Sequence, residues 1–158
     1  MSDDIRYYAL IILFALGMFA IDDFRGITRT CYDGADGHEI VLHNNKTAVD
    51  PTFEQVKAFA REDLTNTKKY TSKYQCGDFS EEFHDNAEAA GYKCGWVFVD
   101  LENGPEDHAC NVFNTTDAGL VFIDCTHGDS RVRVAKGEEY KPKHYESLGF
   151  VSNYNILW

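Results

Sequence analysis

The chain has 158 residues, which is the size of one domain, and its formal net charge at pH 7 is -11. Its eleven Phe, nine Tyr and two Trp argue against a disordered chain, because they supply enough apolar surface for a core. An acidic surface without a stripe of Lys and Arg repels phosphate backbones, so we expect no nucleic-acid partner.

An uninterrupted apolar run near the start of the chain extends from Tyr7 to Ile21. As a helix it would be about 22 Å long, against about 30 Å for the hydrocarbon core of a bilayer. This length suits a short membrane anchor, the apolar part of a signal peptide, or a buried helix. An acidic start disfavours a signal peptide, and the lack of a polar face disfavours a buried helix. We therefore expect an anchor helix over residues 1–24, a single-pass membrane location and a domain outside the cytoplasm.

Residues 25–50 have little hydrophobic periodicity, and we expect a tether there with one short strand at Glu39–His43. The first helix is expected to begin near Thr52, which together with Gln55 resembles a capping box. Apolar residues then recur at helical spacing as far as Leu64.

A second helix is expected from Cys76 to Ala90, with Gly91 as its natural stop. Strand patterns follow at residues 92–101, 108–115 and 119–126, and residues 131–135 could add a fourth strand. The tail from Lys141 is expected to be irregular. This order predicts an α+β domain over residues 51–158, in which a helix packs on an antiparallel sheet.

The five cysteines stand at positions 31, 76, 94, 110 and 125 and include no C-x-x-C pair. This spacing argues against a zinc ribbon or a thioredoxin-type motif. An odd number of cysteines allows one reactive thiol with two disulfides. It equally allows five reduced thiols, most of them small core residues, and the sequence leaves both arrangements open.

Three residues have the chemistry of a thiol active site. Cys76 stands where a loop enters a helix, and the N–H groups of a helix start favour a thiolate and bind an oxyanion. His108 opens one predicted strand and Asp124 lies near the end of the next, so a hairpin would place them side by side. With Cys76 as nucleophile, His108 as base and Asp124 as the residue that orients the imidazole, such a site performs acyl transfer.

The stretches around these residues resemble the transglutaminase-like superfamily, which has a papain-like thiol fold. The matching segments are Cys76-Gly-Asp-Phe-Ser, Ala89-Ala-Gly91, His108-Ala-Cys-Asn-Val and Val121-Phe-Ile-Asp-Cys-Thr126. The resemblance covers about residues 50–130 and implies a small domain of the prokaryotic type, with its catalytic helix packed on the antiparallel sheet. It implies a cysteine protease, amidase or transglutaminase-like enzyme that acts on a protein or peptide and needs no cofactor.

Gln75, Tyr74 and Tyr70 are the candidates for contacts to an oxyanion or to the substrate, since they stand close before Cys76 in the sequence. Gln75 also resembles the Gln that precedes the active-site Cys of animal transglutaminases. Cys110 and Cys125 depart from the superfamily, which often has an aromatic residue and a proline at these places.

Two other interpretations use the same residues. One is a catalytically inactive binding module. The other is a zinc-stabilised domain, because two pairs of His and Cys at i, i+2 spacing lie on neighbouring strands: His108 with Cys110, and Cys125 with His127. Zinc sites usually use tight turns rather than strands, so we expect no metal.

Overall fold

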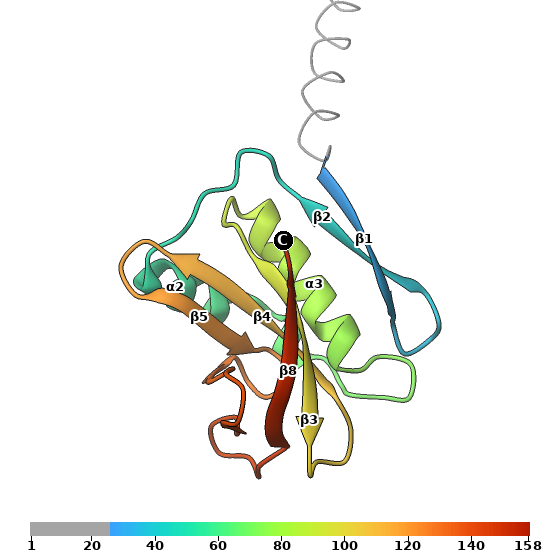
Figure 1. Ribbon diagram of the computed structural model, residues 1–158. Coiled ribbons are helices and arrows are strands. Elements are labelled where there is room, and N and C mark those ends of the chain that lie inside the picture. Colours follow the sequence, from blue (N-terminus) through green and yellow to red (C-terminus); the bar gives the residue numbers. More distant parts are fainter. Residues whose placement is uncertain (1–25) are drawn as a thin grey trace, which may run out of the picture.

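The computed structural model describes residues 26–158 of the chain (Figure 1). Of these residues 41% lie in strands and 20% in helices. Within this range, a six-stranded antiparallel sheet has the order β6-β5-β4-β3-β8-β7 and curls into a nearly closed, barrel-like shape. Two α-helices and a separate two-stranded hairpin complete the described part.

The hairpin consists of β1, Gly26–Asp33, and β2, Glu39–Asn44, and it occupies the segment that the sequence predicted as a tether. The short strand predicted at Glu39–His43 is confirmed by β2. Its alternate residues Ile40 and Leu42 are fully buried and pack with Trp96 of the main sheet. The hairpin is therefore docked on the domain, because burial of these two side chains excludes water from its inner face.

The first described helix, α2, spans Phe53–Glu62 and begins at the predicted capping box. Thr52 Oγ1 accepts a hydrogen bond from the Gln55 N–H (3.3 Å), and the Thr52 N–H donates to Gln55 Oε1 (2.8 Å). Val56 and Ala60 lie one turn apart and bury the same face. A 3₁₀ turn, η1, follows at Thr65–Thr67.

The second helix, α3, spans Cys76–Ala89, close to the predicted bounds. Gly91 ends it with a φ of 88°, a left-handed conformation that glycine adopts without strain. Phe79, Phe83 and Ala87 line one face of α3 and form a core with α2, β4 and β5. This packing sets the position of the helix start, which carries Cys76.

The strands of the sheet run antiparallel to their neighbours, and their bounds are β3 Gly95–Glu102, β4 His108–Thr115, β5 Gly119–Asp124, β6 Ser130–Val132, β7 Glu139–Tyr140 and β8 Gly149–Leu157. Alternate residues of β3 serve two cores: Trp96 faces the hairpin, whereas Val97 and Val99 face the inside of the curled sheet. In Figure 1 the helices and the hairpin lie on the outside of this sheet.

The predicted fold class, an α+β domain with a papain-like or transglutaminase-like core, is wrong. The described part is mostly β, and its six-stranded antiparallel sheet curls into a nearly closed, barrel-like shape instead of the predicted papain-like or transglutaminase-like core. Part of the error lies near the end of the chain. The strand β7 was not predicted, and the tail from Lys141, predicted to be irregular, contributes β8. The polar residues Ser152, Asn153 and Asn155 interrupt the apolar alternation of β8, so its pattern was too weak to indicate a strand.

The predicted single-pass membrane location is also corrected. Among residues 26–158, every helix falls short of the length and apolar character needed to cross a bilayer. The predicted anchor helix, residues 1–24, lies outside the described residues.

Candidate functional site

The three predicted triad residues come from the ends of three elements. Cys76 is the first residue of α3, His108 is the first of β4, and Asp124 is the last of β5. The antiparallel register pairs Asn111 with Ile123, so the start of β4 lies beside the end of β5. As a result, His108 Nε2 lies 3.0 Å from Asp124 Oδ2, as the predicted hairpin requires.

The imidazole of His108 lies between the other two side chains. The ring nitrogen Nε2 lies 3.0 Å from Asp124 Oδ2, and the nearby thiol of Cys76 also acts on the ring and raises its pKa. His108 is 6% exposed and Asp124 is fully buried, whereas Cys76 remains partly exposed. A substrate can therefore reach the sulfur, while water has little access to the His–Asp pair.

The charges of this pair follow from its contacts. Burial alone lowers the pKa of His108, but its hydrogen bonds to Asp124 and Cys76 outweigh burial and raise the pKa well above its ordinary value. Burial alone raises the pKa of Asp124, but hydrogen bonds from His108 and His127 hold it well below its ordinary value. The site therefore favours an imidazolium beside Cys76 and a carboxylate behind it.

Asp124 accepts hydrogen bonds from two further residues. The ring Nδ1 of His127 lies 3.1 Å from Oδ2, and the His127 N–H donates to Oδ1 at 3.1 Å. The hydroxyl of Tyr140 donates to Oδ2 at 3.0 Å. Sequence reasoning considered His127 only as a zinc ligand and missed Tyr140, which lies in a two-residue strand with no periodic pattern of its own.

Tyr70 and Gln75, two of the predicted oxyanion or substrate contacts, lie beside Cys76. Tyr70 lies close to Cys76, and burial together with the nearby thiol raises the pKa of its hydroxyl to about 12. Gln75 precedes the helix and lines the same pocket as Cys76, and its backbone N–H donates to Asp78 Oδ2 at 2.7 Å.

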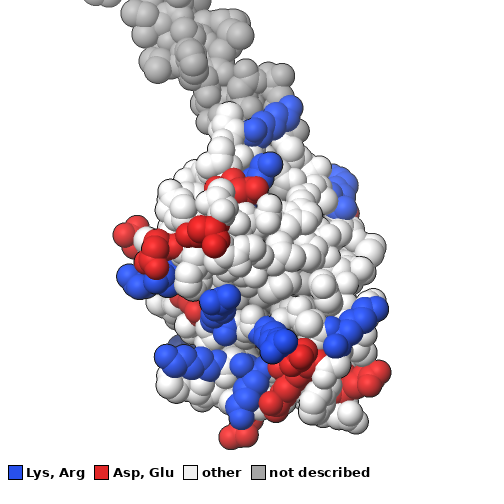
Figure 2. All heavy atoms as spheres, turned by 60° about the vertical axis from the view of Figure 1, so that its left-hand side comes forward, with Lys and Arg blue, Asp and Glu red and all other residues white. Residues whose placement is uncertain are grey.

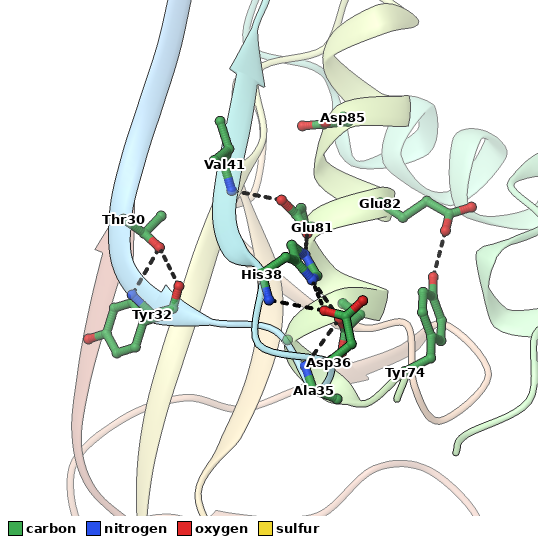
Figure 3. A network of polar contacts seen from close by, with 12 residues as sticks. Thr30, Tyr32, Ala35, Asp36, His38, Val41, Tyr74, Glu81, Glu82 and Asp85 are labelled. Atoms are coloured by element: carbon green, nitrogen blue, oxygen red, sulfur yellow. Dashed lines mark hydrogen bonds and ion pairs between the residues drawn. The ribbon is translucent and has the colours of Figure 1, made fainter. Parts of the chain in front are cut away.

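Tyr74, the third of these candidates, points elsewhere. Its hydroxyl donates to Glu82 Oε2 at 2.6 Å, on the side of α3 that faces away from the β1–β2 hairpin (Figure 3). Its ring packs on Phe79 with the centroids 4.6 Å apart. The structure therefore gives Tyr74 a packing role and does not bring it to the thiol.

A pocket of about 230 Å³ opens beside Cys76 and His108. The rings of Tyr32, Trp96 and Phe98 form its apolar wall, with the Tyr32 centroid 5.0 Å from Trp96 and 4.6 Å from Phe98. Tyr32 belongs to the β1–β2 hairpin, so the segment predicted as a tether supplies part of the candidate site.

Side chains of α3 hold the hairpin in this position (Figure 3). Glu81 accepts from the Val41 N–H at 2.7 Å and binds His38 Nε2 at 2.8 Å, and Asp78 accepts from the Ala35 N–H at 3.1 Å. The hydrogen bonds of His38 with Glu81 and Asp36 raise its pKa to about 9. His38 is therefore charged at neutral pH and links the hairpin to the start of α3.

A second pocket, of about 350 Å³, lies on another side of the imidazole of His108. Tyr70, His127 and Tyr145 line it, and Asp107 and His108 line both pockets. The ring of His127 meets the ring of Tyr145 edge-on at 4.6 Å. The imidazole of His108 therefore borders two pockets.

The cysteines do not form the predicted alternative zinc site. Among the described residues, the sets of side chains close enough to share a metal ion are His108 with Asp124 and His127, and Asp36 with His38 and Asp78; neither includes a cysteine.

All five cysteines are free thiols in residues 26–158, which answers the open question of disulfides for this structure. Burial raises the pKa of Cys94, Cys110 and Cys125, so these three are unreactive core thiols.

Comparison of the chain with protein-family models, with curated proteins and with solved structures found no match. The resemblance to the transglutaminase-like superfamily therefore stays a prediction.

Proposed function

We propose that this protein is a thiol-dependent acyl-transfer enzyme with Cys76 as nucleophile, His108 as general base and Asp124 as the residue that orients the imidazole. One observation supports this proposal above all. A buried imidazole has one nitrogen on a buried carboxylate at 3.0 Å and its other side on a partly exposed thiol at a helix start. This is the arrangement by which a base activates a nucleophile and is itself held in one tautomer.

The reaction begins from a thiolate–imidazolium pair, in which His108 already holds the proton of the Cys76 thiol. The thiolate then attacks the carbonyl carbon of an amide or ester, and a carbon–sulfur bond forms. His108 returns the proton to the leaving nitrogen or oxygen as its bond to carbon breaks, which leaves an acyl thioester on Cys76. Water or an amine then attacks the thioester, gives its proton to His108 and releases the thiol.

The start of α3 supplies the means to stabilise the oxyanion that forms in both steps. The first N–H groups of a helix have no partners within the helix, and its dipole favours negative charge there. The hydroxyl of Tyr70, which lies close to Cys76, is placed to add a side-chain donor. Oxyanion stabilisation of this kind contributes about 10²–10³-fold per donor.

An acylation experiment tests the proposal without knowledge of the substrate. The protein is mixed with p-nitrophenyl acetate, and the release of nitrophenolate and the acetyl adduct are followed by absorbance and by peptide mass spectrometry. We expect a burst of release and an acetyl group on Cys76, both lost in Cys76→Ala. Exposed Cys31 serves as the control thiol, since it lies on the hairpin strand β1 with no base in the triad geometry.

The variant His108→Ala decides the outcome. If the proposal holds, acylation of Cys76 falls by at least about 10²-fold, the ordinary contribution of a general base, while that of Cys31 is unchanged. Equal acylation of Cys76 with and without His108 contradicts the proposal and leaves the inactive binding module as the better interpretation.

A further inference from the structure

A separate pocket of about 450 Å³ lies between α2, the turn at η1 and the loop that joins β5 to β6. Three cationic side chains line it: Lys57 and Arg61 from α2, and Arg131 from β6. Figure 2 looks onto the side of the molecule that carries α2, and Lys and Arg gather in the lower half of that face. In a chain with a net charge of -11, such a concentration of positive charge indicates a site for an anionic ligand.

The two arginines have no carboxylate partner among residues 26–158. The ion pairs of Lys and Arg in this range join Arg29 to Glu39, Lys57 to Glu54, Lys68 to Glu82, and Arg133 to Glu138. Arg61 and Arg131 belong to none of these pairs, so their guanidinium groups remain free for a ligand. A guanidinium binds an oxyanion through two parallel hydrogen bonds, which a lone ammonium cannot do.

The ring of Phe53 fixes the position of two of the cations. Arg131 Cζ lies 4.9 Å and Lys57 Nζ 5.0 Å from the centroid of this ring. The two charges are therefore within about 10 Å of each other, although they come from elements more than 70 residues apart in the sequence. A guanidinium that packs on an aromatic ring keeps its N–H edge available, so this arrangement orders Arg131 before any ligand binds.

Asp129 is the one carboxyl group that lines the same pocket. One of its oxygens accepts a hydrogen bond from the Asn66 amide, and the other, Oδ1, is buried without a partner. Burial raises the pKa of Asp129 to about 7, with Asp63 and Asp124 adding repulsion. A carboxyl group that is only about half ionised near neutral pH opposes a bound anion less than a full negative charge would, so the pocket keeps its positive character.

We propose that this pocket binds a phosphate group, held by Arg61 and Arg131 with Lys57 as the third cation. Two guanidinium groups without ion-pair partners in residues 26–158, with the ammonium of Lys57 lining the same pocket, favour a doubly charged anion over a singly charged carboxylate. The volume exceeds that of a phosphate ion, which leaves room for the remainder of a phosphorylated small molecule. The lining residues include none of Cys76, His108 and Asp124, so this binding is independent of the proposed acyl transfer.

Titration of the full-length protein at constant ionic strength tests the proposal, with amide chemical shifts followed by NMR. We expect inorganic phosphate to shift the amides of α2 and of residues 128–131 in a saturable manner. Arg131→Gln and Arg61→Gln are expected to weaken binding about tenfold or more each, because each removes a charge-assisted pair of hydrogen bonds. Arg133→Gln is the matched control, since Arg133 lies two residues beyond Arg131 but pairs with Glu138 at 3.2 Å.

The outcomes separate the sources of phosphate and the competing explanations. Tighter binding of glycerol 3-phosphate than of inorganic phosphate supports a phosphorylated small molecule as ligand, and equal binding supports free phosphate. Shifts that do not saturate, equal losses in Arg131→Gln and Arg133→Gln, or acetate that binds as tightly as phosphate would each overturn the proposal. Arg131→Lys keeps the charge but loses the two parallel N–H donors of the guanidinium. Its affinity for phosphate is therefore expected to lie between those of the wild type and Arg131→Gln.

Discussion

Replacement of Asp124 by Asn tests the candidate site most severely, because all the contacts of this carboxylate come from hydrogen-bond donors. Oδ2 accepts from His108 Nε2 and from the Tyr140 hydroxyl, and Oδ1 accepts from the backbone N–H of His127. The ring Nδ1 of His127 lies 3.1 Å from Oδ2 and 3.2 Å from Oδ1. An amide offers one acceptor oxygen and one donor nitrogen. In Asp124→Asn, the amide nitrogen, itself a donor, must therefore face groups that donated a hydrogen bond to the carboxylate.

The backbone N–H of His127 cannot change its role, so we expect the amide oxygen at that end and the amide nitrogen toward His108. The imidazole must then accept at Nε2 and carry its proton on Nδ1. In that tautomer it no longer takes the proton of Cys76. A wrong tautomer of the base lowers the rate of acylation by about 10⁴-fold.

The same substitution also lowers stability. Breaking a buried charged pair costs about 3–5 kcal/mol, because one partner stays buried without its counter-charge. Urea unfolding measures this loss, and acylation of Cys76 by p-nitrophenyl acetate measures the change in rate. Tyr140→Phe is the matched control, since it removes one donor but keeps the carboxylate, and we expect a loss of about 1.5–3 kcal/mol with the pH dependence of acylation retained. A fully active Asp124→Asn protein, or one destabilised by less than about 1 kcal/mol, would refute this reasoning.

The remaining predictions concern reactivity, the hairpin and the core. Iodoacetamide is expected to label Cys76 and Cys31 in the native protein and the other three cysteines only after unfolding, as peptide mass spectrometry can establish; native labelling of a buried thiol would contradict the burial given above. At pH 6 Cys76 is expected to react faster than Cys31, because the imidazolium of His108 lies beside Cys76 and favours its thiolate. His38→Gln removes the link between the hairpin and α3. Because the folded pKa of His38 is raised from 6.5 to about 9, the stability that it contributes is fully present below about pH 6.5 and is lost as the pH rises through about 9. The difference in unfolding free energy between wild type and His38→Gln should shrink across this window, and a constant difference would count against the link. Ile40→Ala is expected to cost about 2–5 kcal/mol in urea unfolding, because Ile40 is fully buried; a cost below about 1 kcal/mol would mean that the hairpin is not docked.

Local signals in the sequence predicted the helices and the central strands. Thr52 and Gln55 marked the start of α2 through their side chains alone, and Gly91 marked the end of α3. The runs that became β4 and β5 are rich in β-branched and aromatic residues and are separated by a short turn. Each of these signals depends on residues within a few positions of one another, so it can be read without knowledge of the fold.

The strands at the two ends of the described chain could not be predicted in this way. In β1 the burial alternates only between half-buried and exposed residues, and β8 carries polar residues at several positions. The conformation of these strands depends on their partners. Most of β8 pairs with β3, whose residues lie about 50 to 60 positions earlier in the chain. Such pairing is a long-range contact, and the alternation of apolar and polar residues within a short stretch of sequence does not reveal it.

The assembly of the candidate triad despite the wrong fold class has a physical reason. The triad needs only a helix start packed against one end of a β-hairpin, and β4, β5 and α3 provide that arrangement through their shared core of Phe83, Phe113 and Ile123. The fold class depends instead on what is added at the edges of the sheet, where β8 and β7 extend it beyond β3. These same additions complete the site, because β7 brings Tyr140 to Asp124 and the β1–β2 hairpin brings Tyr32 to the pocket beside Cys76. The proposed chemistry thus depends on α3, β4 and β5, which short stretches of sequence predict. We expect the selection of a substrate to depend on the β1–β2 hairpin, which lines the pocket beside Cys76.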